Sequence, residues 1–438
     1  MKKITLLLTL AATFIGSASF AQAKIEFEEF TLDNGLHVIL HQDNSTPIVA
    51  VSVLYHVGSK DENPERTGFA HFFEHLLFEG SENIGRGEFS EYVEKAGGVL
   101  NANTSNDRTF YYDLLPSNQL ELGLWLESER MLHAKVDEKG IETQREVVKE
   151  EKRQRVDNQP YGTLLEEVMK RAYTKHPYQW QVIGSMEHLD AATEEDYVGF
   201  YETYYVPNNA TLSIAGDIDI KETKKMVEMY FGDIPRGKDI PRVDIVEPDM
   251  TEEVRDTVYD NIQLPAVVHA FRIPAQGTDD FYAVSLLNTL LSQGESSRLN
   301  KSVVDDKELA IQVMAFPFPL EHPGVNLVFG LANMGKDPGE MEKAMDAEYK
   351  RAREELITEE ELEKLKNQLE SNMIMRNSTM AQIAESLANY HTYFGDANLI
   401  NTEIERYRKV TREDIKRVAN KYFHENNRVA LYFLPESN

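Results

Sequence analysis

The chain of 438 residues contains no cysteine. This absence excludes disulfides, thiolate metal sites, cysteine nucleophiles and a lipidated N-terminal cysteine. Basic residues are also scarce, with 46 Lys and Arg against 74 Asp and Glu and a formal net charge of −28. A surface this acidic repels phosphate backbones, so we expect no nucleic-acid partner. The charge favours basic peptides or serves only to keep the protein soluble.

Long hydrophobic runs are missing as well, apart from one at the N-terminus. Lys2 and Lys3 precede an apolar segment over 4–15, and Ala21-Gln22-Ala23 follows it. This order is typical of a secretory signal peptide, and the apolar segment is shorter than the roughly 20 residues of a membrane span. We expect residues 1–23 to be a signal peptide cleaved after Ala23, with the mature protein periplasmic. Loss of the two lysines changes the net charge from −28 to −30.

The length predicts more than one domain, and internal repeats indicate a duplication. Segment 193–209 aligns without a gap with segment 411–427. Each begins with a Thr-x-x-Asp capping box, continues as an amphipathic helix and passes an Asn-Asn turn into a strand. A fainter match relates 76–80 to 290–294. We predict two similar mixed α/β domains at 24–233 and 251–438, joined by a Pro-rich linker at 234–250.

Hydrophobic patterning places a few elements within these halves. Segments 30–41 and 49–56 are predicted to form a hairpin, followed by a helix near 68–78. In the second half a strand at 267–273 precedes a helix near 280–291. A capping box at 358–361 begins a long helix whose Leu362, Leu365 and Leu369 share one face, which predicts a core position for all three.

The most informative stretch is His71-Phe72-Phe73-Glu74-His75. On a helix His71 and His75 project from the same face, where two imidazoles can hold one ion. Glu74 lies beside them, where a carboxylate can take a proton from a metal-activated water. The H-x-x-E-H order is that of the inverzincins. The alternative is a helix with two half-buried histidines, which would leave costly unpaired polar groups against the neighbouring apolar side chains.

A catalytic zinc site usually has three protein ligands and one open position, so a third ligand is expected. The acid-rich segment 145–151 is the candidate, because it is expected to be a helix that Val147 and Val148 can pack against the rest of the domain. Spacing alone does not choose among Glu146, Glu150 and Glu151.

Further motifs follow the metal motif in a fixed order. They are Thr67-Gly68-Phe69-Ala70 before it, Phe78-Glu79-Gly80-Ser81 after it, then Gly97 to Thr104, His176-Pro177-Tyr178 and Tyr205-Val206-Pro207-Asn208-Asn209. Together they resemble the M16 (pitrilysin) zinc metallopeptidases, in particular the short two-domain branch with mitochondrial processing peptidase and bacterial relatives. The resemblance covers almost the whole mature chain. It implies an α+β fold, with two similar domains of antiparallel-rich sheet packed by helices, forming half of a clam-shaped chamber.

Carried over to this sequence, the resemblance implies one Zn²⁺ per chain, held by His71, His75 and Glu151, with Glu74 as general base. It favours Glu151 over Glu150 by the spacing from the second histidine. Many relatives carry another functional Glu where this chain has Gln144, so that role is either lost or moved to Glu146.

The resemblance also implies that Gly97–Thr104 is an edge strand to which substrate adds as a further strand. Asn101, Ala102 and Asn103 are then the substrate-binding residues. The remaining histidines, including His56, His133, His188 and His391, are interpreted as ordinary surface or core residues.

Family members that work alone usually carry an Arg and a Tyr in the second half, which hold the substrate and support the oxyanion. Here Val304 and Ile311 occupy those positions, and neither can donate a hydrogen bond. We therefore expect a second subunit of similar fold that supplies the pair. A homodimer would lack both groups unless another residue such as Arg298 compensates.

These observations predict a periplasmic zinc endopeptidase that cleaves peptides or unfolded segments, as the zinc-bearing subunit of a two-chain enzyme. The main alternative is a non-catalytic subunit that uses the peptidase fold for assembly. An intact His71, Glu74, His75 and Glu151 set argues against it, because a scaffold does not need Glu74. A zinc hydrolase acting on non-peptide amides ranks third.

Overall fold

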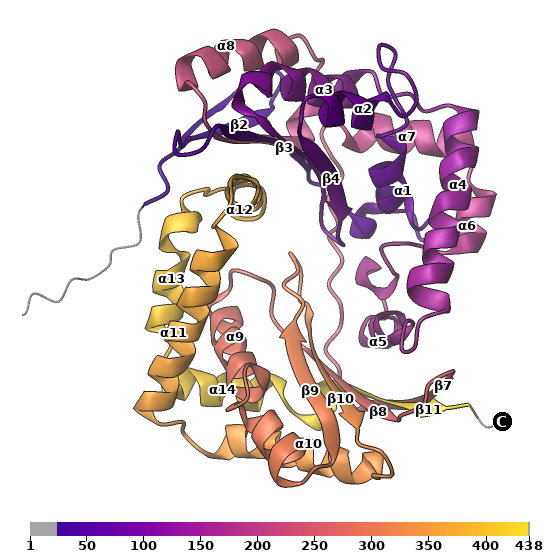
Figure 1. The fold of residues 1–438 in the computed structure, drawn as a ribbon. Coiled ribbons are helices and arrows are strands. Elements are labelled where there is room, and N and C mark those ends of the chain that lie inside the picture. The colour runs from indigo at the N-terminus through magenta and orange to yellow at the C-terminus, as the bar shows by residue number, and fades with distance from the viewer. Residues whose placement is uncertain (1–23, 437–438) are drawn as a thin grey trace, which may run out of the picture.

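The computed structural model of this protein describes residues 24–436 and contains two sheets that face each other (Figure 1). The predicted signal peptide, residues 1–23, lies outside the described residues. The first sheet has the strand order β1-β2-β6-β3-β5-β4, and the second β7-β11-β8-β10-β9. The strands are β1 (Glu28–Thr31), β2 (His37–Gln42), β3 (Ile48–Tyr55), β4 (Val99–Thr104), β5 (Thr109–Pro116), β6 (Ala210–Gly216), β7 (Val254–Asp260), β8 (Ala266–Arg272), β9 (Ala310–Pro317), β10 (Val325–Ala332) and β11 (Arg428–Pro435).

Helices connect the strands, and most of them cover the outer side of a sheet (Figure 1). In the first half they are α1 (Phe69–Leu76), α2 (Glu88–Lys95), α3 (Leu120–Leu132), α4 (Glu138–Lys152), α5 (Leu164–Ala172), α6 (Met186–Ala191), α7 (Glu194–Tyr204) and α8 (Ile220–Phe231). In the second half they are α9 (Asp279–Ser292), α10 (Pro338–Glu354), α11 (Glu359–Arg376), α12 (Met380–Phe394), α13 (Leu399–Lys409) and α14 (Arg412–Tyr422). Two π-helical segments, η3 (Arg153–Asp157) and η6 (Asn300–Asp306), follow α4 and α9.

The two sheets share one topology, which confirms the predicted α+β fold with two similar halves. Without β1, the first sheet reads β2-β6-β3-β5-β4 and matches β7-β11-β8-β10-β9 strand for strand. In each sheet the first two of these strands are parallel and the other neighbouring pairs are antiparallel. Each sheet ends on an edge strand, β4 in one half and β9 in the other.

The predicted hairpin between 30–41 and 49–56 is wrong. Strand β2 pairs with β1 on one side and with β6 on the other, so β6 separates it from β3. All seven residues of β6 are buried, which suits a central strand whose two faces are both covered. Alternating hydrophobicity identifies a strand but not its partner, and this partner comes from much later in the chain.

Other local predictions are confirmed. The helix predicted near 68–78 is α1, the one near 280–291 is α9, and Thr193, Thr358 and Thr411 each form a complete capping box. The leucine face of α11 packs inward: Leu362 and Leu365 are buried, and Leu369 is partly buried against the same core.

One helix of each half packs on the sheet of the other half. Helix α12, from the second half, packs on the first sheet, where Ile383, Ala384 and Leu387 share one buried cluster with Ala50 and Ala215. Helix α5, from the first half, packs on the second sheet, with Val168 and Met169 in one cluster with strands β8, β10 and β11. This reciprocal exchange (Figure 1) ties the two halves together through their cores.

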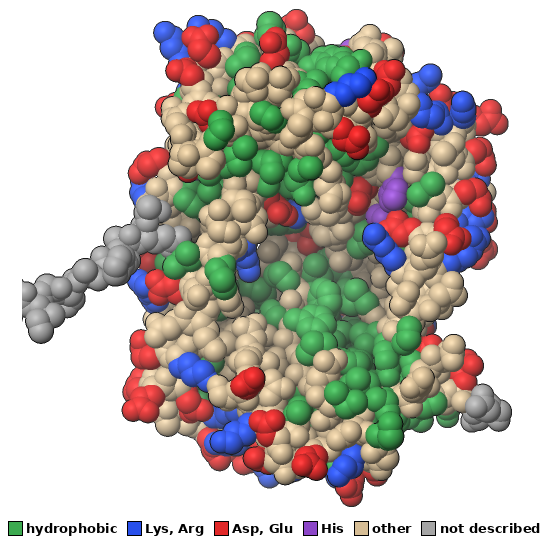
Figure 2. Space-filling view, viewed as in Figure 1, with side chains coloured by type: hydrophobic (Ala, Val, Ile, Leu, Met, Phe, Trp, Pro, Cys, Tyr) green, Lys and Arg blue, Asp and Glu red, His purple; other side chains and the backbone are tan. Residues whose placement is uncertain are grey.

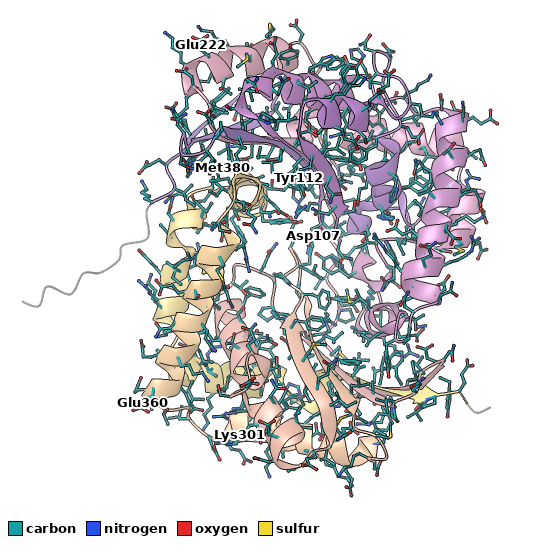
Figure 3. All side chains as sticks on the ribbon, in the orientation of Figure 1. Asp107, Tyr112, Glu222, Lys301, Glu360 and Met380 are labelled. Atoms are coloured by element: carbon teal, nitrogen blue, oxygen red, sulfur yellow. The ribbon has the colours of Figure 1, made fainter. Side chains whose placement is uncertain are left out.

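A buried polar group also joins the halves. Asp107 lies between the two sheets (Figure 3). One of its carboxylate oxygens accepts a hydrogen bond from the Tyr178 hydroxyl at 2.5 Å, and the other accepts one from the backbone N–H of Glu321 at 3.0 Å. The side chain of Glu321 in turn contacts His56 at 2.9 Å, so the loop between β9 and β10 is fastened to the first half.

The two halves enclose a hollow that opens toward the viewer in Figure 2. Apolar side chains gather on its lower wall, over the second sheet. On edge strand β9 the exposed members are Ile311, Met314 and Phe316. Among the described residues, no helix has the length and hydrophobicity required to cross a membrane.

Candidate metal centre

Helix α1 carries the H-x-x-E-H motif, and the residues before it determine where it begins. Gly68 precedes the helix with φ of +95°, and a Cβ at this position would lie 2.8 Å from the carbonyl oxygen of Ile183. The buried carboxylate of Glu62 accepts hydrogen bonds from the backbone N–H groups of Gly68 (2.8 Å) and Ala70 (2.9 Å). Glu62 thus satisfies free N–H groups of the first turn and complements the helix dipole.

One face of α1 packs into an aromatic cluster, which orients the other face. Phe69 and Phe72 both stack on Tyr197 of α7, with ring centroids 4.5 Å apart in each pair. The Tyr111 hydroxyl of β5 donates a hydrogen bond to the carbonyl oxygen of Phe73 at 2.8 Å. With this face buried, His71 and His75 turn together toward α4.

The third expected ligand comes from α4. Glu151 Oε2 lies 3.5 Å from His71 Nε2 and 3.1 Å from His75 Nε2. One donor atom from each of the three residues falls within 4.8 Å of the other two. The structure therefore brings together the three residues that the sequence proposed as metal ligands.

The neighbouring glutamates of α4 point elsewhere. The side chain of Glu150 is 54% exposed and pairs with Arg153, and that of Glu146 is 66% exposed and pairs with Lys149. The side chain of Glu151 is only 14% exposed. Among the three candidates, Glu151 alone turns toward the histidines.

The donor set fits a zinc ion. Two imidazoles and a carboxylate form a ligand set that occurs in catalytic zinc sites, and three protein ligands leave one position open. Glu151 Oε2 is buried and makes no hydrogen bond within the described part of the chain, although two ring nitrogens lie close to it. Burial, and then the proximity of His75, lower the pKa of His71 to about 4, so its ring is neutral at neutral pH.

Glu74, the proposed base, faces the same region and is held by a residue that the sequence analysis did not single out. The hydroxyl of Thr104, at the end of β4, donates a hydrogen bond to Glu74 Oε2 at 2.6 Å. Burial raises the pKa of Glu74, and the Thr104 hydrogen bond opposes that rise. Thr104 lies within the quoted Gly97–Thr104 motif, but only the strand pairing brings it to α1.

Strand β4 carries the three proposed substrate-binding residues. It pairs with β5 on one side and is the last strand of its sheet on the other. Ala102 is buried in the core, whereas Asn101 and Asn103 are exposed. Asn103 accepts a hydrogen bond from Arg108 at 2.7 Å. The arrangement therefore leaves an edge strand open beside the candidate metal centre, with its exposed side chains on one face.

The residues considered for auxiliary roles lie apart from the three donors. Gln144 donates a hydrogen bond to Glu79 at 2.5 Å, and Glu79 also pairs with Arg86 at 2.9 Å. In the second half, Val304 belongs to η6 and packs against the core, and Ile311 is exposed on β9. Arg298 is buried, with its guanidinium 3.6 Å from Glu361.

Family models match both halves of the chain. Residues 37–185 match the model described as insulinase (peptidase family M16), and residues 191–369 match the model described as the peptidase M16 inactive domain. The candidate metal centre falls within the first match, and the second match contains the positions of Val304 and Ile311.

Similar proteins span the same length. The zinc protease PqqE of Helicobacter pylori is 30% identical over 99% of both chains, and the uncharacterized zinc protease YmxG of Bacillus subtilis is 26% identical over 92% of this chain and 97% of its own. A crystal structure of a protease from Helicobacter pylori superposes with a TM-score of 0.89 at 30% identity, over 94% of this chain and all of that one.

A longer protein shares the fold. The periplasmic protease PqqL of Escherichia coli superposes with a TM-score of 0.77 at 19% identity, over 94% of this chain but only 48% of that one. This chain is thus similar to half of that structure.

Proposed function

The chain belongs to peptidase family M16, and from this membership and the geometry of the metal centre we propose that it is a zinc-dependent endopeptidase. The observation that carries the proposal is the convergence of His71, His75 and Glu151, with Glu74 beside them. Zinc, the metal in the names of similar proteases, fits this donor set.

Within this proposal, each residue has a defined task. His71, His75 and Glu151 would hold the ion, which when bound polarises the scissile carbonyl and makes water a stronger nucleophile. Glu74 accepts the proton of the attacking water and passes it to the leaving amine. Thr104 keeps the Glu74 carboxylate oriented and counteracts the rise in its pKa that burial causes.

We propose that the substrate is an extended peptide or unfolded segment. The open edge of β4 can pair with an extended backbone, which gives affinity with little demand on sequence. Asn101, Ala102 and Asn103 would lie along that pairing, and the buried Ala102 would contribute through its backbone alone. The hollow between the two halves lies open to such a chain (Figure 2).

We further propose that a second subunit of the same fold completes the enzyme. Val304 and Ile311 stand where the resemblance implies an Arg and a Tyr, and neither side chain can donate a hydrogen bond. Similarity to only 48% of the PqqL structure fits a chain that forms half of a larger chamber. A homodimer is the alternative assembly. Export to the periplasm, with removal of the signal peptide after Ala23, belongs to the same proposal.

A non-catalytic assembly subunit is the competing function, and the name of the inactive-domain model matched by residues 191–369 keeps it under consideration. The centre itself argues against it. A scaffold needs neither a buried carboxylate beside two imidazoles nor Thr104 positioned to hold Glu74.

The test is cleavage of a mixed pool of unstructured peptides by the purified mature chain, read by mass spectrometry. Glu74→Gln is the matched variant, because it keeps the shape of the side chain but cannot accept a proton as a carboxylate does. In the presence of a subunit that carries Arg and Tyr, we expect zinc-dependent cleavage that disappears in Glu74→Gln while the zinc content of that variant stays at the wild-type value.

The outcomes separate the candidates. Cleavage that persists in Glu74→Gln would contradict the proposed base. No cleavage by a chain that holds zinc, followed by activity when a subunit carrying Arg and Tyr is added, would support the two-chain enzyme. Full activity of a pure homodimer would contradict it, and inactivity with every partner would favour the assembly subunit.

A further inference from the structure

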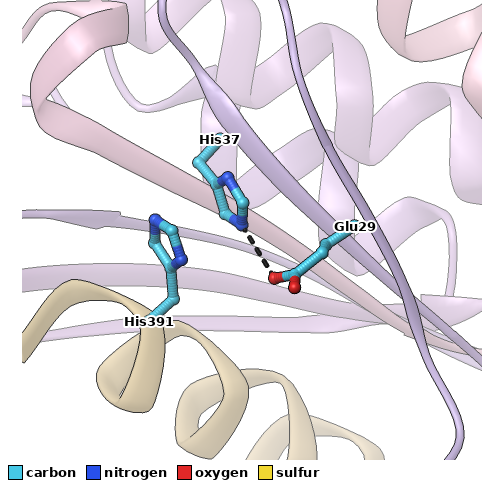
Figure 4. A group of neighbouring side chains, drawn as sticks. All are labelled: Glu29, His37 and His391. Carbon is cyan, nitrogen blue, oxygen red and sulfur yellow. Dashed lines mark hydrogen bonds and ion pairs between the residues drawn. The ribbon is translucent and has the colours of Figure 1, made fainter. Parts of the chain in front are cut away.

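A second group of metal-ligating side chains lies where β1 and β2 meet α12 (Figure 4), at the end of the first sheet opposite β4. Glu29 of β1, His37 of β2 and His391 of α12 each offer one ligand atom within 4.8 Å of the other two. His37 Nε2 lies 3.2 Å from Glu29 Oε2. The rings of His37 and His391 are stacked, with centroids 3.4 Å apart and planes 1° from parallel.

The ring of His391 is available to a cation, whereas the ring nitrogens of His37 lie within hydrogen-bond distance of Thr31 and Glu29. His391 makes no hydrogen bond through its ring within the described part of the chain. Burial lowers the pKa of His37 to about 4, and burial, followed by the proximity of His37, does the same for His391. At neutral pH the pair is therefore uncharged, and each ring has a nitrogen lone pair that can bind a metal.

The surroundings of His37 suit a ligand role. Its Nδ1 lies 3.2 Å from the hydroxyl of Thr31, which can accept a hydrogen bond as well as donate one. If Nδ1–H donates to Thr31, Nε2 is left with a lone pair directed toward Glu29. Ligating histidines are commonly held by such a hydrogen bond from the second ring nitrogen.

We propose that Glu29, His37 and His391 form a second metal site, which takes a divalent transition ion such as Zn²⁺. Two imidazoles and one carboxylate suit this class of ion, and water can complete the coordination. A stacked pair has parallel lone pairs, so binding requires the two rings to tilt until their nitrogens converge. The exposed Glu29 side chain can follow that movement.

The position of the site gives it a structural role. Glu29 and His37 come from the first two strands of the first sheet. His391 comes from α12, the helix of the second half that packs on that sheet. An ion bound here would link the two halves directly. It would therefore stabilise the packing of α12 on the first sheet. This structural role is independent of peptide cleavage.

The experiment measures zinc bound per chain. Untagged mature protein is stripped with a chelator, saturated with Zn²⁺, desalted and analysed by elemental mass spectrometry. We expect two zinc ions in the wild type, one in His391→Ala, one in Glu29→Gln and one in His75→Ala. His424→Ala is the control, because His424 is only partly buried and, within the described part of the chain, its ring hydrogen-bonds only to the carbonyl of Lys421; it should keep two.

A thermal melt with and without Zn²⁺ gives a second readout. In the His75→Ala background, added Zn²⁺ should still raise the Tm, and the further change His391→Ala should abolish that rise. Loss of zinc from Glu29→Gln cannot be attributed to misfolding, because the substituted side chain is exposed. One zinc in the wild type, or two zinc ions retained in both His391→Ala and Glu29→Gln, would overturn the proposal.

Discussion

At the scale of single residues, the candidate centre depends on which carboxylate of α4 faces the two imidazoles. Glu150 and Glu151 are adjacent in sequence but project in different directions, because successive residues of a helix are about 100° apart. Glu151 turns inward beside His71 and His75, while Glu150 pairs with Arg153 in solvent. The two residues therefore form a natural matched pair for mutation.

We predict that Glu151→Gln lowers zinc affinity by more than the roughly 10–100-fold that loss of an outer partner costs a metal site. The amide removes the charge and is a weaker ligand than the carboxylate. Competition with a zinc-binding dye measures the effect, and Glu150→Gln should leave the affinity unchanged. Equal losses in both variants would show that Glu151 acts only through the overall charge of α4.

A second prediction concerns Thr104. Thr104→Val removes the hydrogen bond that opposes the burial-induced rise in the pKa of Glu74, so that pKa should rise further. Since Glu74 must be deprotonated to act as a base, the acidic limb of the kcat/KM profile should move to higher pH. Thr104→Ser keeps the hydroxyl and should retain the wild-type profile. An unshifted limb in Thr104→Val would mean that the contact has no effect on the base.

At the scale of elements, the start of α1 is determined by backbone geometry as much as by side chains. Gly68 has a positive φ and lies against the backbone at Ile183, and Glu62 caps the first turn. Both features keep the H-x-x-E-H residues in register with α4. Gly68 and Glu62 thus position the motif, although neither residue binds the metal or takes part in the proposed reaction.

We predict that Gly68→Ala destabilises the protein by about 1–3 kcal/mol, because a Cβ strains the backbone and contacts the carbonyl of Ile183. Thermal unfolding measures the loss, and weaker zinc binding should accompany it if α1 shifts. Gly87→Ala is an informative comparison. Gly87 also has a positive φ but nothing lies within 4 Å of its added Cβ, so its loss should be smaller.

At the scale of the whole molecule, the exchange of α5 and α12 makes each half depend on the other. Each helix covers an apolar sheet face of the opposite half. Dividing the chain at the Pro-rich segment 234–250 would therefore leave each sheet on a different fragment from one of the helices that packs on it. The Asp107 hydrogen bonds cross the same interface. Neither half can bury its core completely without the other.

We therefore predict that fragments 24–250 and 251–438 aggregate when expressed separately and form a soluble complex when expressed together. Each fragment alone exposes the apolar face that the exchanged helix covers, which favours association. Size-exclusion chromatography of each preparation distinguishes the outcomes. Two monodisperse fragments that unfold cooperatively on their own would contradict the prediction.

Much of this protein was predictable from sequence because the signals are local. Helix geometry within a few turns explains the H-x-x-E-H spacing and the capping boxes at Thr193, Thr358 and Thr411. The repeat of 193–209 at 411–427 is found by comparing two short segments of the sequence. Local chemistry of this kind can be recognised before the chain is folded. It indicated two similar halves and two of the proposed metal ligands, whereas the α+β fold class was implied by the family resemblance.

Only the tertiary structure decided the relations between distant segments. It inserted β6 between β2 and β3, placed Thr104 on Glu74, exchanged α5 with α12, and stacked His391 on His37. Each of these contacts joins residues that are remote in sequence. Their pairing depends on which burial of apolar surface is most favourable for the entire chain, and no short segment of sequence contains that information.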